Sequence, residues 1–368
     1  MIEANWGLQG NEWAVDMLRQ HIRQDGIRHA YLVSGPPGVG KRSLALRFAK
    51  AVNCEKPPEK GEVCGNCKSC DGIGKMQYSD LAIVQSETGK RILNVAQVRD
   101  MQHSLYLKPY QGKYRVALFL RFQEANDSAV NALLKTLEEA PTHAILILTT
   151  ENSEQLNPTI VSRCETLRLH PLPVERLELY LKSQGYDPVK SNLLAHVSGG
   201  RVGYAIRMGM DEKVNFLIER EHRLDEMQEQ LSSTRVQRFK YADKLTKVKR
   251  DNNKENPGSA EKTTDGKKKK DPPTFQDLWD TYWVSELHLA LEIWGTFWRD
   301  VMLTCAGSKS TLTNIDRVDQ INALAERISM EKARKLVLDN EKAIERLNKN
   351  VNARMAMEVM LLDWPYVR

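Results

Sequence analysis

Apolar runs alternate with helix-like patterns over the first half of the chain. In an amphipathic helix apolar residues recur every three or four positions, whereas a strand that is buried on both faces is apolar throughout. Runs of the second kind occupy residues 30–34, 81–85, 116–120, 144–150 and 166–169. Between them, residues 128–139 place Leu133, Leu134 and Leu137 on one helical face. This alternation predicts a doubly wound α/β domain over residues 1–172.

The strand pattern stops after Pro173. Short helical patterns at residues 174–184 and 191–197, and from about residue 202, predict a small helical domain over residues 173–210.

Longer helical patterns predict an all-α domain over residues 211–368. Within it, Trp283, Leu287, Trp294 and Trp298 share one face of a helix expected from about residue 276 to 304. An aromatic stripe of this kind is typical of the core of a helix bundle.

The composition is that of a globular chain with enough apolar residues for more than one core. The chain has 368 residues, of which 41% are hydrophobic. No apolar run approaches the roughly 18 residues of a membrane-spanning helix. The first residues lack the basic start and apolar core of an export signal. We therefore expect a cytoplasmic protein without membrane contact.

The excess of basic residues is local. The net charge of +6 comes from 54 Lys and Arg against 48 Asp and Glu, and residues 244–270 alone hold ten basic and four acidic residues. A broad DNA-binding face is therefore not required. Polar and helix-breaking residues fill the segment from about 250 to 273, which predicts a disordered lysine-rich loop. We favour a solvated insertion over a loop that contacts DNA phosphates.

A glycine-rich sequence follows the first predicted strand, where α/β sheets bind nucleotides. Gly35, Gly38, Gly40 and Lys41 have the spacing of a phosphate-binding loop, in which backbone N–H groups and the lysine contact phosphate oxygens. The next residue is Arg42, where the standard loop has the hydroxyl that holds Mg²⁺. The flanking strand and helix patterns favour a true phosphate loop over a chance glycine-rich turn, but one without its metal ligand.

The acidic half of such a site is also altered. In nucleotide hydrolases a later strand ends in carboxylates that hold the metal. Here the strand predicted at 115–120 runs into Leu120 and Arg121, and Glu124 comes several residues too late. We therefore expect the loop to hold phosphate without hydrolysing it, and the binding of ATP or ADP to be weak or absent. As a hypothesis, the Arg42 guanidinium replaces part of the missing Mg²⁺ charge.

Four cysteines have the spacing of a metal site. Cys54, Cys64, Cys67 and Cys70 form a C-x9-C-x2-C-x2-C sequence within residues 54–70. Overlapping C-x2-C steps let neighbouring thiolates bind one cation, and four sulfurs complete the tetrahedron that Zn²⁺ prefers. The alternative, disulfide bonds, is disfavoured in a chain expected in the cytoplasm. Because four protein ligands leave no open position, the predicted zinc is structural.

Several further sequences occur together with these motifs in one order. They are Trp6-Gly-Leu-Gln-Gly10, His29-Ala-Tyr-Leu32, Asn131-Ala-Leu-Leu-Lys-Thr-Leu-Glu-Glu139, Ser162-Arg163-Cys164 and residues 350–362. Together they resemble the clamp-loader branch of the AAA+ family, over nearly the whole chain apart from the lysine-rich loop.

The resemblance implies an architecture. An AAA+ α/β domain would carry the zinc knuckle, the helices of residues 173–210 would form a lid, and the C-terminal all-α domain would form a collar. In this family five subunits make an open ring, and ATP binds between neighbours. The ring opens a sliding clamp and leaves it on primed DNA.

The resemblance also implies a role for Arg163. In clamp loaders the arginine of the Ser-Arg-Cys sequence reaches into the ATP site of an adjacent motor subunit. A degenerate nucleotide site beside an intact Ser-Arg-Cys sequence is similar to a non-hydrolysing subunit of the bacterial DNA polymerase III loader. Such a subunit itself has neither ATPase nor polymerase activity. Its partners would be the motor subunits, a delta subunit, the sliding clamp and primed DNA, within the replication machinery of the cytoplasm.

Other interpretations stay open. From its residue type alone, Arg163 is favoured as an ordinary surface ion pair. The arginine expected in the nucleotide-sensing helix of the lid is replaced by Tyr204, with Arg201 and Arg207 offset from it. Two alternative functions are an active DNA-dependent motor ATPase of the same family and a zinc-bearing nucleic-acid-binding protein with a vestigial nucleotide fold.

Overall fold

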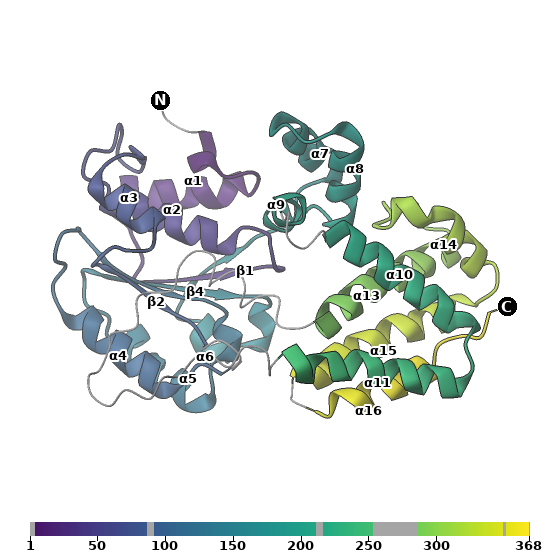
Figure 1. Ribbon diagram of the computed structural model, residues 1–368. Coiled ribbons are helices and arrows are strands. Elements are labelled where there is room, and N and C mark those ends of the chain that lie inside the picture. Colours follow the sequence, from purple (N-terminus) through teal and green to yellow (C-terminus); the bar gives the residue numbers. More distant parts are fainter. Residues whose placement is uncertain (1–3, 87–91, 211–215, 253–285, 349–350, 368) are drawn as a thin grey trace. The chain divides into compact units, whose positions relative to one another are not determined.

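The computed structural model describes residues 4–86, 92–210, 216–252, 286–348 and 351–367. These residues form two compact units (Figure 1). The first unit contains residues 4–180 and 199–206, and the second contains 181–198 and the described residues after 206.

Five parallel strands form the centre of the first unit. They are β1 (Ala30–Ser34), β2 (Leu81–Val84), β3 (Arg115–Phe119), β4 (Ala144–Thr150) and β5 (Glu165–Arg168). Their order in the sheet is β2-β3-β4-β1-β5, so β1 pairs with β4 on one side and with β5 on the other. The predicted parallel α/β sheet is confirmed, and each predicted run lies within one or two residues of its strand.

Successive residues of each strand point to opposite faces of the sheet, and helices cover both faces (Figure 1). Tyr31 and Val33 pack into a core with α1 (Glu12–Arg23), α2 (Lys41–Asn53) and α3 (Lys68–Gly74). Leu32 packs into a second core on the other face. That core includes residues of α4 (Val95–Tyr106), α5 (Asp127–Glu138) and α6 (Pro158–Val161). Because both faces are buried, the strands are apolar throughout.

Among its described residues the second unit is helical. It includes α8 (Pro188–Val197), α10 (Phe216–Ser232), α11 (Arg235–Asn252), α13 (Glu286–Cys305), α14 (Val318–Ala325), α15 (Met330–Asn348) and α16 (Ala353–Leu362). The boundaries between the two units fall within α7 (Val174–Ser183) and α9 (Val202–Met210) and beside α8. The three-domain division at residues 172 and 210 stays a prediction.

Short 3₁₀ segments complete the described secondary structure. They are Ala4–Gly7, Phe122–Glu124, Ser153–Gln155 and Ile315–Arg317. No helix in the described parts of the chain combines the length and the apolar composition that a bilayer crossing needs.

Aromatic side chains form the centre of the second unit. Trp294 and Trp298 both meet Trp364 edge to face, with ring centroids 5.2 and 5.8 Å apart. The Trp294 indole N–H donates to the backbone oxygen of Arg223 at 3.0 Å. The predicted aromatic stripe is therefore core, although Trp283 lies outside the described residues.

The lysine-rich loop predicted from about residue 250 overlaps the end of helix α11. Helix α11 continues through Asn252, so residues 250–252 are helical. Lysine and arginine are good helix formers, and the basic residues at the end of α11 extend the helix rather than break it. The remainder of the predicted loop lies outside the described residues.

One buried arginine joins three chain segments of the second unit. The Arg238 side chain is almost fully buried, and burial lowers the pKa of its guanidinium. The guanidinium donates to five backbone oxygens at 2.7 to 3.3 Å, in the last turns of α10 and α16 and just after α16. They are those of Gln230, Leu231, Leu361, Trp364 and Pro365.

Replacement of this arginine tests its contribution. In Arg238→Met we expect the free energy of unfolding of the second unit to fall by about 3 kcal/mol or more, because the change removes five buried hydrogen bonds from a charged donor, each worth about 1.5–3 kcal/mol. Urea unfolding followed by far-UV circular dichroism measures the difference. Arg235→Met, at an exposed position of the same helix, is the control. Equal losses for the two variants would contradict the assignment.

Candidate functional site

The glycine-rich loop connects β1 to α2, and at Gly38 it leaves no space for a side chain. Its first N–H, from Gly35, donates to the oxygen of Thr150 at the end of β4, at 3.2 Å. Gly38 has a φ of +77°, and a Cβ atom there would lie 2.8 Å from the Cβ of Tyr204. Both the backbone conformation and this close contact therefore require glycine.

The Lys41 ammonium and the Gly38 oxygen of the loop both bond within the chain. The Lys41 ammonium donates to the Gly35 oxygen and, at 3.0 Å, to the Pro36 oxygen. The N–H of Gly203, in the first turn of α9, donates to the Gly38 oxygen at 2.8 Å. In a phosphate-bound loop the lysine contacts phosphate oxygens instead. The loop is thus closed by its own lysine and by the start of α9.

Tyr204 occupies the position where the resemblance places an arginine. The Tyr204 side chain is buried, and the Arg201 guanidinium lies over its ring at 4.1 Å from the centroid. The first turn of α9 therefore packs an aromatic residue against the loop.

Arg42 and Ser43 point to different surroundings. The Arg42 guanidinium donates to the Met76 sulfur at 2.9 Å, and burial lowers its pKa to about 10. Ser43 lines a cavity on the next face of α2. The hypothesis that Arg42 replaces Mg²⁺ charge stays a prediction, since the contact described for it is with Met76.

An arginine binds the carboxylate near the end of β3. Arg121 has a left-handed backbone with φ 56°, and its guanidinium lies 2.7 Å from the Glu124 carboxylate and 4.0 Å from that of Glu151. The Ser86 hydroxyl donates to the other oxygen of Glu124. The Glu124 side chain is only 8% exposed. Its carboxylate is therefore already engaged by two groups of the chain.

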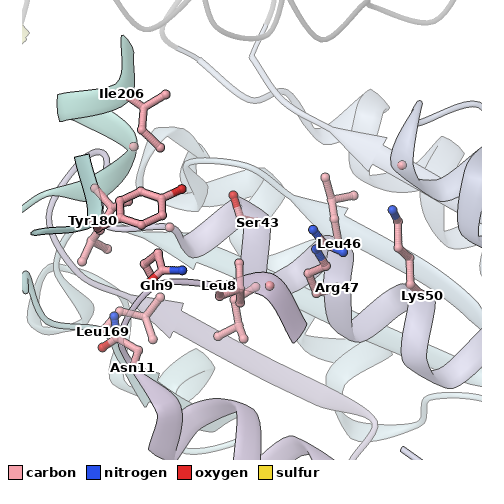
Figure 2. Close-up of a pocket in the computed structure, with 18 residues that line it drawn as sticks. Leu8, Gln9, Asn11, Ser43, Leu46, Arg47, Lys50, Leu169, Tyr180 and Ile206 are labelled. Atoms are coloured by element: carbon pink, nitrogen blue, oxygen red, sulfur yellow. The ribbon is translucent and has the colours of Figure 1, made fainter. Parts of the chain in front are cut away.

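A cavity of about 340 Å³ lies beside the first turns of α2. Ser43, Arg47 and Lys50 from α2 contribute to its lining, as do Tyr180 and Ile206 (Figure 2). The lining is mixed, with apolar residues and glycines, neutral polar side chains and two cations. Of the five predicted loop residues, only Gly40 reaches this cavity. Its volume lies at the low end for small-molecule sites.

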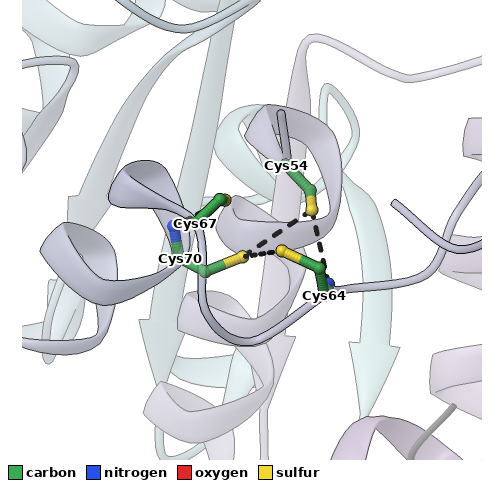
Figure 3. A group of neighbouring side chains, drawn as sticks. All are labelled: Cys54, Cys64, Cys67 and Cys70. Atoms are coloured by element: carbon green, nitrogen blue, oxygen red, sulfur yellow. Dashed lines mark hydrogen bonds between the residues drawn. The ribbon is translucent and has the colours of Figure 1, made fainter. Parts of the chain in front are cut away.

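The four predicted cysteines meet in one cluster (Figure 3). Their sulfur atoms all lie within 4.8 Å of one another. Two separations are 3.9 Å, from Cys64 to Cys70, and 3.7 Å, from Cys54 to Cys70. Sulfurs bound at 2.3 Å to one tetrahedral zinc lie about 3.8 Å apart. The cluster could therefore bind a zinc ion, and all four cysteines are free of disulfide bonds.

Local hydrogen bonds prepare one of these thiols. Burial acts to raise the pKa of Cys64, but hydrogen bonds from the backbone of Asn66 and Cys67 outweigh it and lower the pKa to about 6. This shift favours the thiolate, the form that binds metal. Burial raises the pKa of Cys54 and of Cys70.

Arg163 lies in the turn between α6 and β5. Its Nη2 atom is 2.7 Å from a carboxylate oxygen of Glu138 at the end of α5, and its Nη1 atom donates to the Thr159 oxygen at 3.1 Å. The Arg163 side chain remains 34% exposed. The next residue, Cys164, is packed, and burial raises the pKa of its thiol to about 12.

The first part of the chain is similar to a known protein family. Residues 10–173 match the family model described as DNA polymerase III, delta subunit. This part of the chain is similar to that family. The relation to clamp-loader subunits that the motifs predict is thereby confirmed.

Relatives extend the likeness beyond the matched residues. The delta' subunit of Bacillus subtilis DNA polymerase III is 25% identical over 348 residues, which cover 94% of this chain and 93% of the relative. The delta' subunit of Pseudomonas aeruginosa is 35% identical over 47% of this chain and 53% of the relative. The tau subunit of Bacillus subtilis is 38% identical over 42% of this chain and 27% of the relative. The chain thus spans between a quarter and about half of the last two.

The sequence located the loop and the cysteines but not their neighbours. The structure brings the four cysteines together and puts Lys41 against its own loop. It places Arg163 in a different part of the unit, beside Glu138. The contacts of Glu138, Met76 and Gly203 join residues far apart in sequence, and no local pattern marks them.

The buried lysine gives a pH-dependent stability. Burial lowers the pKa of Lys41 from 10.5 to about 8. Between these values the unfolded chain binds more protons than the folded chain, so this group makes stability rise with pH. We expect the free energy of unfolding of the native chain to increase relative to Lys41→Met by about 2 kcal/mol from pH 8 to pH 10. Denaturant titrations at each pH measure it.

The control for this comparison is Lys56→Met, at an exposed lysine. Its stability should follow that of the native chain across the same pH range. Parallel curves for the native chain and Lys41→Met would show that Lys41 does not lose its proton in this interval.

The cysteine cluster makes a separate prediction about metal. Protein purified without chelator is expected to contain about one zinc per chain, and Cys67→Ser to lose most of it, because structural zinc needs four ligands. Elemental analysis measures the content. Cys305→Ser, which changes a thiol outside the cluster, should keep the metal. Zinc retained in Cys67→Ser would rule out a four-cysteine site.

Proposed function

We propose that this chain is a non-hydrolysing clamp-loader subunit that supplies Arg163 to the ATP site of a neighbouring motor subunit. The observation that carries this proposal is the position of Arg163 at the edge of the sheet opposite to its own glycine-rich loop.

The register of β1 and β5 supports this position. Tyr31 pairs with Glu165 at the start of the two parallel strands, and Arg163 comes just before Glu165. The loop begins at Gly35, after the other end of β1. At about 3.3 Å per residue, roughly 13 Å of strand separates the two levels. Arg163 is therefore suited to a phosphate held by another molecule and not to one held by this chain.

The groups around the loop argue against hydrolysis by the chain itself. Lys41 bonds to carbonyl oxygens of the loop, and Arg121 occupies the place of a metal-binding carboxylate with its charge against Glu124. The usual Mg²⁺ ligands are missing from the sequence, since Arg42 takes the place of the loop hydroxyl and Arg121 that of a carboxylate after β3. These features favour a non-hydrolysing subunit over a motor ATPase.

The chemistry of arginine fits the proposed role. A guanidinium keeps its charge and offers paired planar donors, which stabilise the charge that spreads over a transferring phosphoryl group. The proposed partners are the motor subunits, a delta subunit, the sliding clamp and primed DNA. In this proposal the cysteine cluster holds a structural zinc, and the helices of the second unit belong to a collar.

Removal of the guanidinium tests the proposal directly. In a reconstituted loader that contains Arg163→Ala, we expect the clamp- and DNA-stimulated rate of ATP hydrolysis to fall by at least about tenfold, since arginine fingers supplied in trans contribute about 10³–10⁵ at a single site. A coupled phosphate-release assay measures the rate, after gel filtration has verified assembly.

Arg168→Ala is the matched control, because Arg168 is an exposed arginine at the far end of β5. It should leave the rate close to that of the native loader. An unchanged rate with Arg163→Ala in an intact assembly would contradict the proposed role.

A further inference from the structure

We propose that Glu138 is a positioning residue for Arg163. The inference rests on the proposed function, because it concerns the same guanidinium. It names a second residue, on a different helix, through which the chain determines where that guanidinium points.

Two anchors hold the guanidinium by different nitrogens. Nη2 contacts a carboxylate oxygen of Glu138 at 2.7 Å, and Nη1 donates to the Thr159 oxygen, four residues before Arg163, at 3.1 Å. A single hydrogen bond leaves an arginine free to rotate about its long side chain. Two bonds to separate nitrogens fix the plane of the guanidinium as well as its position.

The helix that carries the Glu138 carboxylate is firmly packed. Leu133 and Leu137 of α5 are fully buried in the core beneath the sheet, and Ile160 of α6 belongs to the same core. The ends of α5 and α6 are therefore fixed relative to each other. The contact of Glu138 with Arg163 therefore holds the guanidinium at a defined place relative to these two helices.

The position of Glu138 is unfavourable for the helix alone. It is the last residue of α5, where the partial negative charge of the helix end disfavours a carboxylate. The guanidinium of Arg163 offsets this charge. The position of Glu138 is therefore better explained by its contact with Arg163 than by the stability of α5.

The exposure of the pair allows the arginine to act on a partner. Arg163 is 34% and Glu138 51% exposed, and ion pairs this exposed bias a side chain by only a few fold. A polyphosphate carries more negative charge than one carboxylate and can attract the same guanidinium. Glu138 therefore orients the Arg163 guanidinium before a phosphate binds, and the phosphate can still attract the guanidinium away from Glu138.

The experiment uses the reconstituted loader with four versions of this chain: Glu138→Gln, Glu139→Gln, Arg163→Ala, and Glu138→Gln with Arg163→Ala. We expect Glu138→Gln to lower kcat for stimulated ATP hydrolysis about twofold to fivefold, with KM for ATP nearly unchanged, because the interaction acts in the transition state. Glu139→Gln removes the same charge from the adjacent exposed residue and should have no effect.

Two further results distinguish positioning from a structural role. Added to Arg163→Ala, the Glu138→Gln change should lower the rate no further. The difference between the native loader and Glu138→Gln should also shrink as salt is raised, since exposed ion pairs are screened.

The possible failures are separate. If Arg163→Ala leaves the rate unchanged, the proposed function fails and the positioning role fails with it. If Arg163→Ala lowers the rate but Glu138→Gln alone leaves it unchanged or raises it, the proposed role of Arg163 is supported and the positioning role of Glu138 is wrong. The same holds if Glu138→Gln lowers the rate by the same factor in the native loader and in the Arg163→Ala loader. A higher rate with Glu138→Gln would show that the ion pair restrains Arg163.

Discussion

Strand β1 is hydrogen-bonded on both sides, to β4 and to β5, and all three strands run in the same direction. This pairing sends the glycine-rich loop to one edge of the sheet and the turn that carries Arg163 to the other. It also fixes which strand residues face each of the two cores. The register of these three short strands therefore keeps Lys41 of the glycine-rich loop apart from Arg163. No local change in either segment could bring the two residues together.

Much of this arrangement could be predicted from the sequence, for definite physical reasons. Strands covered by helices on both faces are apolar at every position, so their runs stand out from the amphipathic helices between them. The loop and the cysteine cluster are encoded within short segments, Gly35 to Lys41 and Cys54 to Cys70. Spacing alone is informative where a ligand or a metal imposes it.

The contacts that adjust these sites could not be predicted in the same way. Gly203 bonds to Gly38, which lies 165 positions earlier in the sequence, and Arg42 donates to the sulfur of Met76. Arg238 similarly donates to carbonyl oxygens of the preceding helix α10 and of the distant helix α16. Each of these partners is an ordinary backbone group or an apolar side chain. They are brought together by packing of whole elements, and the residues themselves carry no pattern that marks the contact.

Lys41 bonds to carbonyl oxygens that belong to its own loop. In a phosphate-bound loop the same ammonium contacts phosphate oxygens. A nucleotide that enters this loop must therefore take the Lys41 ammonium away from both carbonyl oxygens, so that binding begins with the loss of two bonds within the chain.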